Sequence, residues 1–272
     1  MGRRKPTNRQ LRRQQHLDDM ANKSNRDKKV DAQFKEKNRS GNTKSTYGEK
    51  ENSNNDLRVT LEAKTETQGL MIATMSTNII TFGIGPAGTG KTCAATLYAA
   101  EQLHKRNFKK IILTRPVVEI GKTMGHLPGD INEKYEPYLA PYKKHLIEAF
   151  GRSGYEARLG NSIIPAPLNF IQGESWDDSI ILVDEAQNMT IQEMFMLLTR
   201  IGKNTKVIIT GDIHQTANSS LAHENGLKDF VTRYKASYGL FQHCDISIIE
   251  FTEEDIVRHD VVQRIVKFYN KY

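Results

Sequence analysis

Between Asn78 and Leu103, a short apolar run, a glycine-rich octapeptide and an alanine-rich run follow one another directly. The apolar run, Asn78–Ile84, is rich in β-branched residues and predicts a buried strand. The alanine-rich run, Cys93–Leu103, has apolar residues at helical spacing and predicts a helix. A strand, a glycine loop and a helix in this order form the context in which a loop cradles phosphate groups.

The octapeptide satisfies G-x-x-x-x-G-K-[ST] with Gly85, Pro86, Ala87, Gly88, Thr89, Gly90, Lys91 and Thr92. In such a loop, backbone N–H groups and the positive end of the helix surround the β- and γ-phosphates of a nucleotide. We expect Lys91 to pair with the phosphates and the Thr92 hydroxyl to bind Mg²⁺. The alternative is a chance glycine-rich turn, but the flanking strand and helix favour a site for a nucleoside triphosphate.

Two acidic residues, Asp184 and Glu185, follow the apolar strand predicted at Ser179–Val183. Downstream of a phosphate loop, the first acid is expected to hold Mg²⁺ through water. The second acid, Glu185, is expected to orient and polarise the attacking water as a general base. This role favours a hydrolase over a small-molecule kinase, which would have no use for Glu185. Taken alone, the pair could also be surface acids at a strand end.

A further turn, Thr210–Gln215, ends the next predicted strand. Ligands of open parallel sheets gather at the carboxyl ends of the strands, so this turn should face the γ-phosphate. Gln215 could hydrogen-bond the phosphate or the water and report hydrolysis; the alternative is an ordinary Gly-Asp turn. His214 is expected to be a turn or surface residue.

From Leu57 onward, apolar strands alternate with helices, which predicts an α/β domain over 57–272 with a mostly parallel sheet covered on both faces. Besides those already named, strands are predicted at 109–116, 205–210 and 246–251, and a capping box at Thr190–Glu193 opens a helix over Met194–Ile201. Strand order cannot be read from these patterns. Residues 121–172 are proline-rich and predict an irregular insertion with helices around Tyr135–Phe150.

The positive charge is concentrated near the amino terminus. Residues 1–58 hold 16 Lys and Arg against 8 Asp and Glu, whereas the rest of the chain holds 23 against 24. Residues 1–56 carry few apolar side chains, so we expect a basic, disordered tail. Its cations could neutralise nucleic-acid phosphates, although a solvated extension with few aromatic residues for base stacking is the alternative.

Localisation is predicted from what the sequence lacks. Cys93 and Cys244 are too few for a disulfide framework or a zinc site. There is no apolar run of membrane-spanning length and no signal-peptide pattern. We therefore expect a soluble protein without a membrane partner, in the bacterial cytoplasm, or in the host cytoplasm if a phage encodes it.

These motifs carry a family resemblance. The segments GPAGTGKT, LTRPVVEIG, GHLPGD, VDEAQNMT, TGDIHQ and DIVRHDVVQRIV, in this order over nearly the whole predicted domain, closely resemble the PhoH-like ATPase family. The resemblance implies one RecA-like P-loop domain, ATP binding and hydrolysis, and kinship to superfamily-one helicases. Some members of the family are linked to RNA metabolism and to phosphate starvation, and phage-encoded members are common.

The resemblance also implies roles for residues at matching positions. Gln68 lies where helicase-like ATPases place a glutamine that reads the adenine edge; a solvated helix start is the alternative. Thr114 and Arg115 lie where related motors contact a nucleic-acid backbone or a neighbouring subunit. Arg258 resembles the late arginine that approaches a γ-phosphate; otherwise it is a surface arginine paired with Glu254.

One departure weakens the transfer of nucleic-acid binding. Many relatives carry arginines around the glycine before the Asp-Glu strand, whereas this chain reads Ile171-Gln172-Gly173-Glu174. In addition, about 215 residues hold one RecA-like lobe, while monomeric helicases close two lobes around one ATP. We therefore expect a homo-oligomeric ring, plausibly a hexamer, in which a neighbouring copy completes the site.

The leading hypothesis is an Mg²⁺-dependent ATPase coupled to single-stranded nucleic acid, RNA rather than DNA. The alternative is a nucleotide-gated interaction protein in which slow ATP hydrolysis acts as a timer.

Overall fold

The computed structural model describes residues 57–116, 135–168, 176–215, 225–237 and 246–271. Three predicted segments lie outside the described residues. They are the tail over 1–56, residues 121–134 of the predicted insertion, and the Ile171–Glu174 segment.

Within the described residues, six strands form one parallel sheet in the order β3-β2-β4-β5-β1-β6. The strands are β1 (Ile80–Ile84), β2 (Lys110–Thr114), β3 (Ile163–Pro165), β4 (Ser179–Val183), β5 (Lys206–Gly211) and β6 (Ile246–Glu250). The predicted α/β class with a parallel sheet is thereby confirmed. Because β1 pairs with β5 and β6, and β5 pairs with β4, the loops that follow β1, β4 and β5 lie at one edge of the sheet.

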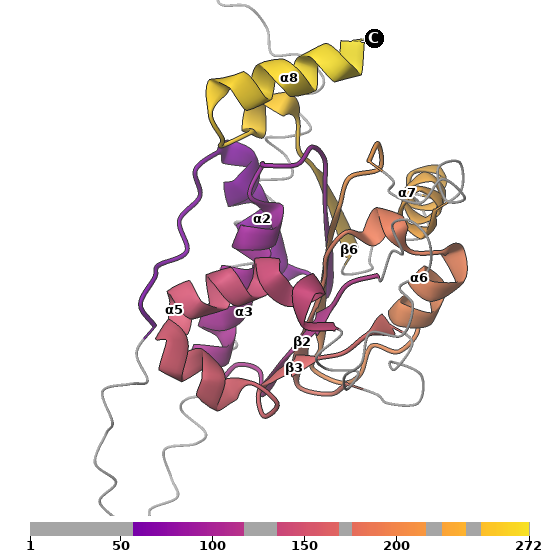
Figure 1. Ribbon diagram of the computed structural model, residues 1–272. Coiled ribbons are helices and arrows are strands. Elements are labelled where there is room, and N and C mark those ends of the chain that lie inside the picture. Colours follow the sequence, from indigo (N-terminus) through magenta and orange to yellow (C-terminus); the bar gives the residue numbers. More distant parts are fainter. Residues whose placement is uncertain (1–56, 117–134, 169–175, 216–224, 238–245, 272) are drawn as a thin grey trace, which may run out of the picture. The chain divides into compact units, whose positions relative to one another are not determined.

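The helices cover both faces of the sheet. They are α2 (Glu66–Thr77), α3 (Lys91–His104), α5 (Ala140–Arg158), α6 (Ile191–Leu198), α7 (Gly226–Ala236) and α8 (Asp260–Lys271), with short 3₁₀ turns η1 (Glu136–Leu139), η3 (Ala186–Asn188) and η5 (Glu253–Asp255). Figure 1 shows α2, α3 and α5 on one side of the sheet and α6 and α7 on the other. No helix within the described residues is long and apolar enough to cross a membrane.

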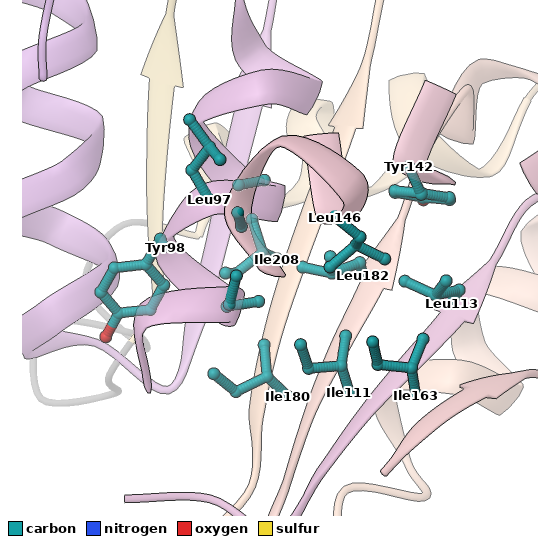
Figure 2. Packing of buried hydrophobic residues seen from close by; sticks show 14 of the residues in the cluster. Leu97, Tyr98, Ile111, Leu113, Tyr142, Leu146, Ile163, Ile180, Leu182 and Ile208 are labelled. Carbon is teal, nitrogen blue, oxygen red and sulfur yellow. The ribbon is translucent and has the colours of Figure 1, made fainter. Parts of the chain in front are cut away.

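Two apolar layers hold the helices to the sheet. Alternate residues of each strand point to opposite faces, so Ile111 and Ile180 pack toward α3 and α5, while Ile112 and Ile181 pack on the other face. Figure 2 shows the first layer, in which Tyr142 and Leu146 of α5 lie against strand residues such as Leu113 and Leu182. The labelled residues of this layer are all less than a tenth exposed, so the frame that carries the strand ends is well packed.

The region predicted as an irregular insertion contributes regular structure. Helix α5 is 19 residues long and packs on α3, and its continuity is broken only at Gly151, where φ is 71° and ψ is 166°. Strand β3 follows it and extends the sheet beyond β2. The helices expected around Tyr135–Phe150 are confirmed, whereas β3 was not foreseen.

Candidate nucleotide site

The glycine-rich loop connects β1 to α3 at the edge of the sheet. Gly88 and Gly90 have φ values of +86° and +79°, the left-handed region that favours glycine. Gly90 is the residue before α3, so the first turn of that helix points its N–H groups into the loop. The loop therefore has the backbone form of an anion cradle.

Lys91 lies inside this loop. Its side chain is buried, and Nζ donates hydrogen bonds to the carbonyl oxygens of Gly85 at 2.6 Å and Pro86 at 2.7 Å and to Oγ1 of Thr89 at 3.1 Å. Burial lowers the pKa of Lys91, while the nearby carboxylate of Asp212 opposes that shift. The ammonium group is thus held at the centre of the loop by three oxygen acceptors.

Three oxygen-bearing side chains converge next to Lys91. The Thr92 hydroxyl donates to Oδ1 of Asp184 at 2.9 Å, and the Thr210 hydroxyl donates to the same oxygen at 2.7 Å. Asp184 is buried at the end of β4. Two hydroxyls and one carboxylate are the ligand chemistry that Mg²⁺ accepts when water and phosphate oxygens complete its shell.

No group of three or more His, Cys, Asp or Glu side chains within the described ranges could hold a metal ion by itself.

Glu185 follows Asp184 in a strained turn. Its φ of 55° places a non-glycine residue in the left-handed region. Oε1 lies 3.5 Å from Nη2 of Arg115, and Oε2 accepts a hydrogen bond from the side-chain amide of Gln187 at 2.5 Å. Both carboxylate oxygens of Glu185 are thus in contact with donor groups, and the turn aims the carboxylate into the cleft described below.

Gln187 is a site residue that the sequence reasoning missed. It is 2% exposed, and its amide oxygen accepts from the backbone N–H of Asp212 at 3.0 Å while its amide nitrogen donates to Glu185. One side chain therefore joins the ends of β4 and β5. The sequence contained one signal, a polar residue two positions after the acidic pair, but nothing in it indicated the partner on β5.

These groups surround one open cleft with a volume of about 460 Å³. Its lining includes Ala87, Gly88, Gly90, Lys91, Thr92, Cys93, Arg115, Asp184, Glu185, Asp212, Gln215 and Arg258. The structure thus brings together the predicted groups of the phosphate loop, the acidic pair and the Gln215 turn. Gln215 is exposed at the cleft, and its backbone N–H donates to the carbonyl of Asp212 at 3.1 Å.

Arg258 lies over the phosphate loop of its own chain. A Cβ atom added to Gly88 would approach Cδ of Arg258 to 2.9 Å, and the backbone N–H of Val257 donates to the Gly88 carbonyl at 3.0 Å. Arg258 therefore lies at the loop of its own chain, and completion of the site by a neighbouring copy stays a prediction. Its contact with the loop also differs from the surface pairing with Glu254 that was the alternative.

Gln68 lies behind the loop. It is 5% exposed, its amide nitrogen donates to the Thr89 carbonyl at 2.8 Å, and its amide oxygen accepts from the Lys64 N–H at 2.8 Å. Gln68 is not among the residues lining the cleft. The alternative that Gln68 is a solvated residue at a helix start is thus wrong. The contact of Gln68 with adenine stays a prediction.

Thr114 and Arg115, the two residues at the end of β2 that were expected to contact a nucleic acid or a neighbouring subunit, differ in their exposure. The side chain of Thr114 is fully buried, and its expected contact with a nucleic-acid backbone or a neighbouring subunit stays a prediction. Arg115 lines the cleft, and Tyr135 fixes its backbone: the Arg115 N–H donates to the phenol oxygen at 2.6 Å and the phenol donates to the Arg115 carbonyl at 3.1 Å. Of these two residues, Arg115 is the one that lines the cleft with a cationic side chain.

Residues 60–270 match the sequence profile of the PhoH-like protein family. The chain belongs to that family. It is 41% identical over 213 residues to a PhoH-like protein of Bacillus subtilis strain 168, covering 78% of this chain and 65% of the relative. It is 34% identical over 211 residues to Protein PhoH of Escherichia coli K12, covering 76% and 58%.

One further relative and one solved structure are also similar to this chain. A PhoH-like protein of Mycobacterium tuberculosis H37Rv is 39% identical over 215 residues, covering 78% of this chain and 59% of the relative. Among solved structures, a Sulfolobus solfataricus SWI2/SNF2 ATPase core in complex with dsDNA is similar with a TM-score of 0.38 at 14% identity, covering 73% of this chain and 46% of that one. The chain spans roughly three fifths of the length of the PhoH-like relatives it matches.

Proposed function

We propose that this PhoH-like protein binds ATP with Mg²⁺ and hydrolyses it, and that single-stranded nucleic acid, RNA rather than DNA, controls the rate. The observation that carries the hydrolytic part is the convergence of Lys91, Asp184 and Glu185 on one cleft. A cation inside a glycine loop, a buried acid with two hydroxyl neighbours and a second acid facing the cleft are the parts that phosphoryl transfer to water requires.

Each residue has a defined part in the proposed reaction. The loop N–H groups and Lys91 bind the β- and γ-phosphates, and the anion competes with the loop carbonyls for the ammonium. Thr92 and Asp184 would hold Mg²⁺, which when bound neutralises charge on the phosphates. Glu185 takes the proton of the attacking water. Gln215 and Arg258 contact the γ-phosphate, and the Arg258 guanidinium spreads the developing charge.

Coupling to nucleic acid is supported by the position of Arg115. Its side chain is 24% exposed, lines the cleft and belongs to the segment where the resemblance implies a contact with a nucleic-acid backbone. The basic residues of 1–56 add further positive charge for phosphates.

We further propose a homo-oligomer, with a hexameric ring as the expected form. The support is the apolar face of α8, where Val261, Ile265 and Phe268 are 47%, 50% and 61% exposed at helical spacing. The segment before α8 contacts the phosphate loop through Val257, so assembly through α8 would reach the site.

The deciding experiment measures ATP turnover of the full chain with RNA, with DNA and without polymer, at two salt concentrations. We expect hydrolysis that RNA raises and that salt weakens. A matched Glu185→Gln variant should still bind ATP but lose about 100-fold or more of its turnover, because a general base contributes that much. If neither polymer changed turnover at low salt, the coupling of hydrolysis to nucleic acid would be contradicted. An active Glu185→Gln variant would contradict the assignment of the hydrolytic site.

A nucleotide-gated interaction protein is the second candidate. The exposed apolar face of α8 also favours it, because a protein partner could bind there instead of another copy. Sedimentation and ATP turnover together distinguish the two candidates. A monomer whose slow turnover responds to a protein and not to RNA would favour the switch. An oligomer whose turnover RNA stimulates would favour the ATPase.

A further inference from the structure

Arg115 and Glu185 form an ion pair inside the cleft, where the proposed reaction needs Glu185 for water. Nη2 of Arg115 lies 3.5 Å from Oε1 of Glu185, and the two side chains are 24% and 39% exposed. Oε2 of the same carboxylate accepts from Gln187. Each of the two carboxylate oxygens therefore faces a donor of this chain, and an attacking water must compete with one of these donors to reach Glu185.

The two donors differ in how firmly they are held. Gln187 is 2% exposed and anchored by Asp212, so it stays with the carboxylate. The backbone of Arg115 is fixed by Tyr135, but its side chain is long, partly exposed and open to the cleft. Of the two, Arg115 is therefore the group that another anion can draw away.

We propose that Arg115 is a positioning residue that restrains Glu185, and that a phosphate other than those of the bound nucleotide releases it by taking the guanidinium. A phosphodiester of a nucleic-acid backbone is the occupant that fits. Its negative charge and its two non-bridging oxygens match an arginine fork, which binds phosphates in two parallel hydrogen bonds. The ion pair then breaks, and Oε1 of Glu185 turns to water.

This proposal rests on the proposed function, because it explains how a polymer at the cleft rim raises hydrolysis. It also makes a prediction that a purely structural or purely catalytic arginine would not. Removing the restraint should make the protein faster without polymer, whereas removing an arginine that stabilises the transferred phosphate makes it slower.

The experiment compares Arg115→Ala, Arg115→Lys and the unchanged full chain by steady-state ATP turnover with and without single-stranded RNA and DNA. We expect Arg115→Ala to raise kcat without polymer by up to about fivefold, the order by which a partly exposed ion pair shifts an equilibrium. KM for ATP should not change, and polymer should no longer stimulate. Arg115→Lys should lie between the two, because a lysine cannot form the fork.

Two controls keep the outcome interpretable. Lys110→Ala removes an exposed cation from the opposite end of β2 and should leave both rates unchanged. The double variant Arg115→Ala/Glu185→Gln should be as inactive as Glu185→Gln alone, because the gain passes through Glu185.

A fall in basal kcat of Arg115→Ala, or an unchanged one, would overturn the restraint, since the nucleotide itself would then use or already occupy Arg115. Undiminished stimulation of Arg115→Ala by polymer would also overturn it. If the unchanged chain shows no stimulation, the nucleic-acid part of the proposed function fails, while a raised basal kcat in Arg115→Ala would still establish the restraint. The two ideas therefore fail separately.

Discussion

The Gln187→Met substitution tests whether the link between β4 and β5 holds the site together. Methionine has nearly the length and volume of glutamine but no amide, so the packing is retained while both hydrogen bonds are lost. Gln187 is 2% exposed, which leaves no room for water to replace the missing groups.

The magnitude follows from the two partners. The N–H of Asp212 becomes a buried donor without an acceptor, which costs about 1–3 kcal/mol. The carboxylate of Glu185 is 39% exposed and regains water, so its lost bond adds little to the free energy of unfolding. We therefore expect a loss of about 1–3 kcal/mol, mostly from Asp212.

Urea unfolding measures the stability, and ATP turnover measures the effect on Glu185, which loses an anchor. The matched variant is Gln187→Glu, which keeps an acceptor for Asp212 but places a second negative charge beside Glu185. Because this charge is buried and faces another carboxylate, Gln187→Glu should lose more stability than Gln187→Met and should also lose turnover. If Gln187→Met matched the unchanged chain in both measurements, the bridge would be of no consequence and the reasoning would be refuted.

Three further predictions concern the loop and its support. Lys91→Ala should weaken ATP binding by about 10- to 100-fold, because hydrogen bonds to charged groups contribute that much. Titration with a fluorescent nucleotide measures this affinity, and an unchanged affinity would reject the loop assignment. Gly90→Ala should cost about 1–2 kcal/mol for its positive φ, and more where a Cβ meets the Gln68 amide at 2.7 Å; a melting temperature equal to that of the unchanged chain would contradict this. Burial raises the pKa of Tyr98 from 10.0 to about 12, so the neutral phenol contributes roughly 3 kcal/mol of stability below pH 10 that is lost as pH rises through 12. Urea unfolding of Tyr98→Phe should accordingly show a smaller loss over that interval, and an identical loss in both chains would refute it.

Much of the fold was readable from the sequence because its strands are buried on both faces. Runs such as Ile180–Val183 are continuously apolar, and this pattern needs no knowledge of the partner strand. The capping box at Thr190 and Glu193 was equally predictable from the sequence, because its two hydrogen bonds are local. Short β3 was missed, since three residues ending in proline carry almost no periodic signal.

Long-range geometry accounts for what the sequence could not indicate. The strand order depends on packing between residues such as Ile111 and Ile180, which no local pattern specifies. Gln187 looked like one more polar residue because its partner, the Asp212 N–H, lies on another strand. The resemblance located Arg258 near the site, but only the structure placed it on Gly88 of its own chain.

The order of the strands has a consequence for how the protein is made on the ribosome. The strand that leads into the phosphate loop, β1, is synthesised early, yet both of its neighbours, β5 and β6, come from the later part of the sequence. A nascent chain that has emerged only as far as β4 therefore has a complete GPAGTGKT segment with no sheet beside it. Nucleotide added during translation should bind only after β6 and Val257 have left the exit tunnel, so ATP would protect the finished domain and not its precursors.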